Sequence, residues 1–446
     1  MSLSEKACDT GAIDLGSSFH MAAVNPSLSE SPICRFGVDT GSLRDMALWM
    51  AERHVKRVAI EATGVYWMPV YEVLELAGLE VVLVDGGRAM SLPGRTKTDV
   101  SDAAWLEKLL SHGMLNPAFV PDGEIIPLRT YRRLWQQCTE KASAEILRMQ
   151  KAFQQMNVRL DKAVTDITGV TGMRITKAII GGERDPKRLA SLRLKSVKME
   201  EAEIAKALDG HFQDQYVFAL RLAVDEYERQ MDNLKQIDEQ IQRELDGLAA
   251  LHPAPASDFE PKKTKARRNK RSLTDLRSRI CSLAGGAVLS VPGIDAPTVL
   301  TLLGECGIDL SRWPTEKHYV SWLGLCPQHR ITGGKVKRSK TKRVRNDAAT
   351  AFRLAAQSLI RSSSALGAML RHIAYRKGMP KAVTAIARIL ATLYYRAIRY
   401  QTAYDDAGGQ LYEERYRQHT LKRMAKTAQK LGYQLVPLNL QTVGVS

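Results

Sequence analysis

The stretch TGAIDLG, residues 10–16, places one acid, Asp14, inside a short apolar segment that has a glycine on each side of the acid. Segments of this kind form buried strands, where an unpaired carboxylate is costly. Asp14 is therefore either a functional group or a hydrogen-bonding residue at a turn. A catalytic carboxylate needs partners from other elements, so the segments that follow bear on the choice.

Short β-branched segments alternate with amphipathic ones through the first 115 residues, a pattern typical of an α/β domain. We expect strands at 10–16, 19–24, 33–38, 57–62 and 80–84, and helices at 41–53, 65–77 and 99–112. Three strands and a helix, followed by strand, helix, strand and helix, is the order of a ribonuclease H-like fold. The sequence therefore predicts such a domain over residues 1–120.

Three more acids fall where that fold would bring them close to Asp14. Glu61 ends the fourth predicted strand in AIEATG, and Asp99 and Asp102 open the last predicted helix in TKTDVSDAAW, residues 96–105. Their i, i+3 spacing puts Asp99 and Asp102 on one helical face, where like charges cost roughly 0.2–0.5 kcal/mol unless a counter-charge is present. The alternative is simple capping, because acids favour helix N-termini.

Four carboxylates at one edge of a sheet suit two hard divalent cations. Paired ions roughly 3.5–4 Å apart activate the attacking oxygen and stabilise the leaving one in phosphoryl transfer. We expect two Mg²⁺ ions at Asp14, Glu61, Asp99 and Asp102, with Lys97 either neutralising the cluster or holding a phosphate.

The net charge points to the same class of partner. The 446 residues include 65 Lys and Arg against 48 Asp and Glu, a net charge of +17. Such an excess is typical of proteins that face phosphate backbones, with a membrane surface as the alternative partner. Six scattered cysteines indicate neither a zinc site nor a disulfide scaffold and fit a reducing cytosol.

The sequence also lacks the patterns of membrane insertion and export. No apolar run approaches the roughly 18 residues of a membrane helix, and the N-terminus has no basic segment followed by an apolar one. We therefore expect a soluble, intracellular protein with no membrane partner.

Strand signals vanish from about residue 139 to 250, and apolar residues recur every seven positions. One series comprises Ile146, Phe153, Leu160 and Ile167 together with Met149, Met156, Ala163 and Val170, and a second series runs from Val217 to Leu245. Two long helices could pair as an internal antiparallel hairpin or as a coiled coil between subunits, which heptads alone do not separate. We expect a helical, coiled-coil domain over 121–250 and a homodimer or homotetramer.

The segment HPAPASDFEPKKTKARRNKRS, residues 252–272, opens with Pro and Ala and closes on a run of basic residues. It predicts a linker over 251–280 that is either a solvated tether or an arm that contacts RNA or DNA. The candidate contacts are Lys262, Lys263, Arg267, Arg268, Lys270 and Arg271. A closing basic helix is expected at 412–433, within a last segment of 406–446.

The part between them, residues 281–405, is predicted to be compact and mainly helical. VPGIDAPTVLTLLGECG, residues 291–307, is either an ordinary helix start or a helix-hairpin-helix-like unit whose backbone N–H groups hold a phosphate. RITGGKVKRSKTKRVR, residues 330–345, is basic throughout, and its two glycines permit close backbone approach. Phosphate contacts are expected from Gly333, Gly334, Lys335, Lys337, Arg338 and Lys340.

The stretches AIDLG, IEATGVYWMPV and KTDVSDAAWL, with VPGIDAPTVLTLLGECG and WLGLCPQHRITGGK downstream, resemble the bridge-RNA-guided transposases of the insertion-sequence one-ten family, DEDD subgroup. The resemblance covers most of the chain. It implies a RuvC-like domain in which Asp14, Glu61, Asp99 and Asp102 are the DEDD set, followed by a serine-type transposase domain. It also implies DNA at element ends and target, a structured guide RNA, and a composite site between the two domain types of different subunits.

The family carries a nucleophilic serine immediately before the two glycines, and this sequence departs there. Thr332 holds that position, and Ser339 follows seven residues later. A hydroxyl nucleophile stores the broken phosphodiester as a protein ester, so strands can be rejoined without an external energy source. Either Thr332, despite its extra methyl group, or Ser339 would attack DNA. The alternative is that Thr332 caps or hydrogen-bonds the turn.

These patterns predict a transposase or site-specific recombinase of an insertion sequence, acting in a prokaryotic cytoplasm and at the nucleoid. Two other functions would use the same residues. The first is a metal-dependent nuclease of the Holliday-junction type that uses its second domain for binding. The second is a non-catalytic nucleic-acid-binding protein whose acids are structural.

Overall fold

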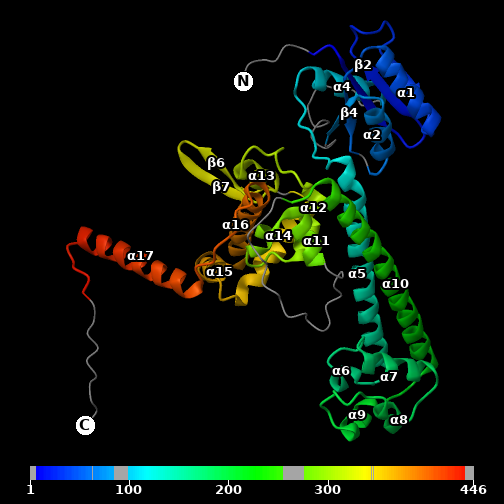
Figure 1. Ribbon diagram of the computed structural model, residues 1–446, viewed down its shortest axis with the longest axis vertical. Coiled ribbons are helices and arrows are strands. Elements are labelled where there is room, and N and C mark those ends of the chain that lie inside the picture. Colours follow the sequence, from blue (N-terminus) through cyan, green and yellow to red (C-terminus); the bar gives the residue numbers. More distant parts are fainter. Residues whose placement is uncertain are drawn as a thin grey trace. The chain divides into compact units, whose positions relative to one another are not determined.

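The computed structural model describes residues 7–62, 64–84, 99–254, 276–342, 344 and 346–436. The chain divides into two compact units, Met1–Val120 and Pro121–Ser446, which we describe one at a time (Figure 1). Within the described ranges, no helix combines the length and the apolar character needed to cross a membrane.

The first unit is a five-stranded sheet with helices on both faces. Its elements are β1 (Thr10–Leu15), β2 (His20–Val24), β3 (Ile33–Phe36), α1 (Thr40–Glu52), β4 (Arg57–Glu61), α2 (Trp67–Leu76), β5 (Glu80–Val84) and α4 (Asp99–Ser111). Each end lies within two residues of its predicted position. The alternation of β-branched and amphipathic segments was therefore sufficient to place these elements.

The strand order of the sheet is β3-β2-β1-β4-β5. β1 and β2 are antiparallel, as are β2 and β3, whereas β4 runs parallel to both β1 and β5. A mixed α/β domain with this sheet is confirmed, and it is consistent with a RuvC-like fold of the ribonuclease H type.

The two faces of the sheet differ in the size of their side chains. Ile13 and Ile60 pack with Met50 and other large apolar residues of α1 and α2 on one face. On the opposite face the strands present Ala12 and Ala59, which pack with α4. Because successive residues of a strand point to opposite faces, Asp14 shares the face of Ala12 and so the side on which α4 lies.

The second unit is mostly helical (Figure 1). A long pair of helices, α5 (Ile126–Gln155) and α10 (Asp214–Leu251), carries a small head of α6 (Leu160–Ala163), α7 (Val170–Ile180), α8 (Pro186–Ser191) and α9 (Glu201–Leu208). The body contains α11 (Leu276–Ala284), α12 (Ala296–Cys306), α13 (Glu316–Trp322), β6 (Pro327–Thr332), β7 (Lys335–Thr341), α14 (Asp347–Ser358), α15 (Ala365–Lys377) and α16 (Met379–Tyr400). The last helix, α17 (Gly409–Lys430), follows the body.

The two long helices pack against each other within the chain, so the internal hairpin is the arrangement found (Figure 1). The second heptad series is largely buried, including Leu220, Leu234 and Ile241. We call the pair of α5 and α10 the stem. Only part of the first series lies in it, because α5 ends at Gln155 and Asn157 has a positive φ of 56°. One long helix through the whole series is wrong, since most of its later members, Met156, Leu160, Ala163 and Ile167, are buried in the head instead, and Val170 is exposed.

The body contains a β-hairpin that the helical prediction for 281–405 omits. β6 and β7 are antiparallel, and Thr332 pairs with Lys335 across the turn. Between them Gly333 and Gly334 have φ values of 56° and 73°. Positive φ at both central residues is the geometry of a type I′ turn, which glycine adopts without strain. The two glycines therefore form the tip of a hairpin.

A buried ion cluster joins α5 to α12. Glu305 is 5% exposed, and its carboxylate accepts hydrogen bonds from Arg133 Nε at 2.9 Å and from Arg129 Nε at 3.2 Å. Arg132 Nη2 lies 3.6 Å from the same carboxylate. Burial alone would raise the pKa of Glu305, but the hydrogen bond from Arg133 and the positive charges of the arginines outweigh it and lower that pKa. Glu305 therefore stays charged at neutral pH.

Candidate active site

β1 and β4 end at the same edge of the sheet, and an acid lies at each end. Because Ala12 lies opposite Ala59 and the strands are parallel, the register brings Asp14 beside Glu61. Both acids follow an alanine by two residues, so both lie on the face that α4 covers. Each is partly exposed. Two carboxylates are thus neighbours at one sheet edge.

α4 places a third acid at that edge. Its Ala103 packs with Met21, which lies opposite Asp14 in the register, while the following turns pack over Ala12. The helix therefore begins at the end of β1 that carries Asp14 and runs back along the strand. Asp102, one residue before Ala103, is 8% exposed. The first turn of α4 thus lies beside the two strand-end acids.

Asp99 is the first residue of α4, and its side chain lies outside what the structure describes, as does all of Lys97. Within the described residues, no group of three or more His, Cys, Asp or Glu side chains is placed to hold a metal ion. The backbone register thus brings together the elements that carry the DEDD residues. Metal binding by the four carboxylates stays a prediction.

The two candidate nucleophiles lie at different levels of the β6–β7 hairpin. Thr332 ends β6 at the tip, whereas Ser339 lies in β7 opposite His329. Three residue steps along a strand amount to about 10 Å. Both side chains are exposed. A single phosphodiester can therefore contact one of these hydroxyls at a time.

The tip of the hairpin is open and basic. A Cβ added at Gly333 or Gly334 would have no neighbour within 4 Å. Lys335, Lys337 and Lys340 are exposed, and none of them forms an ion pair with a described residue. The side chain of Arg338 and all of the predicted arm from Lys262 to Arg271 lie outside the described residues. The three lysines are thus available to an anion.

Two family models match these two regions. A model of DEDD transposases of the IS110 type, described as a transposase, matches residues 12–158. A second, described as transposase of the IS116/IS110/IS902 family, matches residues 285–370. The chain contains the transposase domains of the IS110 family. A search of curated proteins found no match.

The two IS110 matches include both sets of predicted site residues. The first spans Asp14, Glu61, Asp99 and Asp102, and the second spans the hairpin with Thr332 and Ser339. The family assignment supports a transposase or recombinase of an insertion sequence. The matches do not reach α17, which begins at Gly409.

Sequence reasoning missed Glu107, a buried acid in the first IS110 domain. Glu107 is 5% exposed, and its Oε1 accepts hydrogen bonds from Thr10 Oγ1 at 2.7 Å and Asn25 Nδ2 at 2.9 Å. These bonds fix α4 against the start of β1 and the end of β2. The available signal was its position: Glu107 lies four residues after Ala103 and three before Leu110, on the apolar face of α4.

The Pro-Gly turn of the second IS110 domain is an ordinary helix start. Asp295 caps α12 by accepting a hydrogen bond from the Thr298 backbone N–H at 3.1 Å, so a carboxylate already occupies the place where a phosphate would bind. Gly293 has a φ of 87°, and a Cβ there would lie 2.9 Å from the Ala355 carbonyl oxygen. The glycine therefore lets the turn pack against α14.

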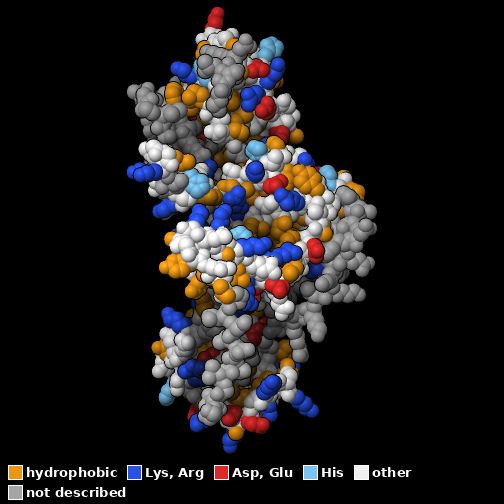
Figure 2. Space-filling view, turned by 90° about the vertical axis from the view of Figure 1, so that its left-hand side faces the viewer, with side chains coloured by type: hydrophobic (Ala, Val, Ile, Leu, Met, Phe, Trp, Pro, Cys, Tyr) orange, Lys and Arg blue, Asp and Glu red, His pale blue; other side chains and the backbone are white. Residues whose placement is uncertain are grey.

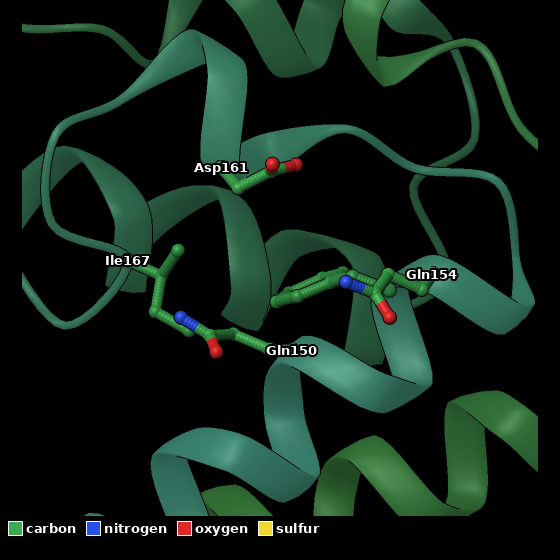
Figure 3. Close-up of a pocket in the computed structure, with 5 residues that line it drawn as sticks. Gln150, Gln154, Asp161 and Ile167 are labelled. Atoms are coloured by element: carbon green, nitrogen blue, oxygen red, sulfur yellow. The ribbon is translucent and has the colours of Figure 1, made fainter.

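A small pocket lies where the end of α5 meets the helical head, and none of its lining residues is a predicted site residue. It measures about 120 Å³ and is lined by Gln150, Phe153, Gln154, Asp161 and Ile167 (Figure 3). The Asp161 carboxylate accepts a hydrogen bond from Arg159 Nε at 3.1 Å, and that hydrogen bond lowers its pKa. The polar lining is thus partly engaged in local contacts.

Proposed function

We propose that this protein is the transposase of an insertion sequence and that it cleaves and rejoins DNA strands. The observation that supports this function best is the register of β1 and β4 with the direction of α4. Together they bring the backbones that carry Asp14, Glu61 and Asp102 to one sheet edge, within a match to DEDD transposases.

The donor set fits Mg²⁺. Asp14, Glu61, Asp99 and Asp102 would supply carboxylate oxygens, which hard cations prefer. The chemistry that Mg²⁺ brings to such a site is stabilisation of charge on phosphoryl oxygens. Asp14 and Glu61 are both partly exposed, as residues that contact a DNA strand would be.

The hydroxyl of the hairpin forms the covalent link in this proposal. Thr332 Oγ1, or Ser339 Oγ, attacks phosphorus, the bond from phosphorus to one strand oxygen breaks, and that oxygen takes up a proton. Lys335, Lys337 and Lys340 stabilise the charge that develops on the phosphoryl oxygens. Reversal with a new strand end rejoins DNA without an external energy source.

Three finer parts of the proposal rest on the family resemblance and on the net charge of +17. A structured guide RNA selects the DNA, the chain acts as a homodimer or homotetramer, and the acids of one subunit meet the hydroxyl of another. On the same resemblance, the reaction takes place in a prokaryotic cytoplasm. The predicted arm over residues 251–280 would contact RNA or DNA.

The metal part is tested by replacing Asp14 or Asp102 with Asn. Cleavage of DNA carrying the element ends should be abolished while the circular dichroism spectrum is unchanged, because a metal ligand contributes little to the core. Asp45→Asn, on the exposed side of α1, is the matched control and should cleave normally. Normal cleavage by Asp14→Asn would rule out the metal assignment.

The covalent part is tested by trapping cleaved DNA on the protein. Thr332→Val keeps the shape of the side chain and removes its oxygen, and Ser339→Ala removes the other hydroxyl. Loss of the adduct in one variant alone identifies that residue as the nucleophile. An adduct that survives in the double variant rules out both. Metal-dependent cleavage with no adduct in the unmodified protein would favour the Holliday-junction-type nuclease instead.

A further inference from the structure

Five of the six Lys and Arg residues of α17 lie on one face of the helix, and Arg417 lies on the opposite side. Arg415, Lys422, Lys426 and Lys430 are spaced by seven, four and four residues, and Arg423 lies next to them on the helix surface. All five side chains are exposed, and none forms an ion pair with a described residue. No acid follows Glu414 in the helix. We call these five residues the α17 stripe.

The start of α17 is anchored to the body. The Gly409 backbone N–H donates to the Ser363 carbonyl at 2.7 Å, and the ring of Tyr416 lies 4.2 Å from that of His372 in α15. Arg371 Nη2 lies 4.0 Å from Glu413 Oε1. These contacts hold the first two turns in place, so the direction of the helix is set by the body.

The rest of α17 extends past these contacts (Figure 1). Gly409 is the one buried residue of the helix, all of whose residues the structure describes. From Arg417 to Lys430 every side chain is exposed except Thr420 and Ala428, which are half-buried. This segment therefore presents its full circumference to whatever binds it.

The α17 stripe is unfavourable for an isolated helix. Lys422, Lys426 and Lys430 stand one turn apart, and like charges at that spacing cost roughly 0.2–0.5 kcal/mol per pair. Neither a nearby acid nor burial offsets this cost among the described residues. A polyanion laid along the stripe would remove the repulsion. Lys and Arg are spread over the whole face drawn in Figure 2, so the stripe is distinguished by its spacing and not by charge alone.

We infer that the α17 stripe binds duplex DNA, outside both regions that match transposase models. The rise from Arg415 to Lys430 is about 22 Å, and a bare helix fits the roughly 12 Å wide major groove of B-DNA. The deep, narrow major groove of duplex RNA does not admit a helix. The stripe then faces phosphates along one wall of the groove. This inference does not depend on the proposed cleavage chemistry.

The test measures the salt dependence of binding to duplex DNA by the full chain. In the variant Arg415→Gln, Lys422→Gln, Lys426→Gln, the slope of log K against log salt should fall by about two to three units, because each lost phosphate contact removes close to one. Affinity at about 0.1 M salt should fall more than tenfold. Circular dichroism checks that α17 stays helical.

The matched control removes three exposed lysines from the head: Lys187→Gln, Lys195→Gln and Lys198→Gln. An equal loss of slope in this control would show that net charge alone binds DNA and would overturn the inference. The same measurement is repeated with a duplex RNA of the same length. An equal loss of slope with the RNA would overturn the choice of DNA. Binding is measured without cleavage, so failure of this site is distinguishable from failure of the proposed cleavage site.

Discussion

Glu107 is a buried carboxylate that two neutral side chains hold in place. Replacing it with Leu should lower the free energy of unfolding of the first unit by about 2–4 kcal/mol, because Thr10 and Asn25 would each lose a buried acceptor. Glu107→Gln should cost less, since its amide oxygen can still accept. Urea denaturation measures both. Glu72→Gln, on the exposed side of α2, is the control and should leave the free energy of unfolding unchanged. An unchanged free energy of unfolding in Glu107→Leu would mean that these hydrogen bonds contribute nothing.

The four candidate acids stand out in the sequence, whereas the partners of Glu107 do not. Asp14 and Glu61 are easily noticed because an acid is rare in an apolar strand segment. Asp102 is noticed because it follows Asp99 by about one helical turn. The partners of Glu107 are Thr10 in β1 and Asn25 just after β2, 97 and 82 residues away in the chain. Local pattern carries no information about such distant donors.

The β6–β7 hairpin, whose turn contains Gly334, is an element that the sequence did not predict. Four strands of the first unit, β1, β2, β4 and β5, were predictable because most of their residues are buried, which gives a short apolar run in the sequence. The β6–β7 hairpin is largely exposed and lacks that signal, so its two strands were not predicted, although a turn at the glycines was one of the alternatives. The prediction of a helix beyond Gln155 failed for the opposite reason. Residues buried in the head keep the apolar spacing although α5 has already ended.

Gly334→Val should disorder the tip of the hairpin. Its φ of 73° lies in the left-handed region, where a side chain costs about 1–2 kcal/mol, more so if β-branched. Faster amide exchange at Lys335, whose strand pairs with β6, would report the loss. Gly123→Ala is the control, because an added Cβ there meets nothing within 4 Å and φ is not positive. Unchanged exchange in Gly334→Val would contradict the turn geometry.

Glu305→Gln should weaken the attachment of α5 to α12. Neutralising Glu305 removes the buried counter-charge of Arg132 and leaves it the more exposed Asp347 at 3.5 Å, at a cost of up to about 3–5 kcal/mol. The folded-state pKa of Glu305 is lowered, so its contribution is complete above the ordinary carboxyl pKa and is lost as pH falls through the depressed value. The unmodified protein should therefore lose stability in acid more steeply than the variant. Glu140→Gln, exposed on α5, serves as control. Parallel pH profiles would exclude the ion cluster as the cause.

At the scale of the whole molecule, each unit has a hydrophobic core of its own. We expect two calorimetric transitions, of which Glu107→Leu lowers one and Glu305→Gln lowers the other. A single transition that both variants shift equally would show that the units unfold together. The sequence predicted nucleic acid as the class of partner, because the net charge of +17 can be counted without knowing the fold. It did not predict the α17 stripe as a site, because exposure along a helix depends on what the fold leaves uncovered.

The stem of α5 and α10 begins and ends at one place. Glu124, two residues before α5, lies 2.8 Å from His252, the residue after α10, so the chain returns to the point from which it departed. Because its two ends lie together, the segment between Glu124 and His252 can be lengthened or shortened without changing the path of the rest of the chain. Because the stem packs with a repeat of about seven residues, matched insertions in both helices would keep its seam intact. The distance from the stem's base to the head can thus change in steps of two helical turns without altering the proposed site residues.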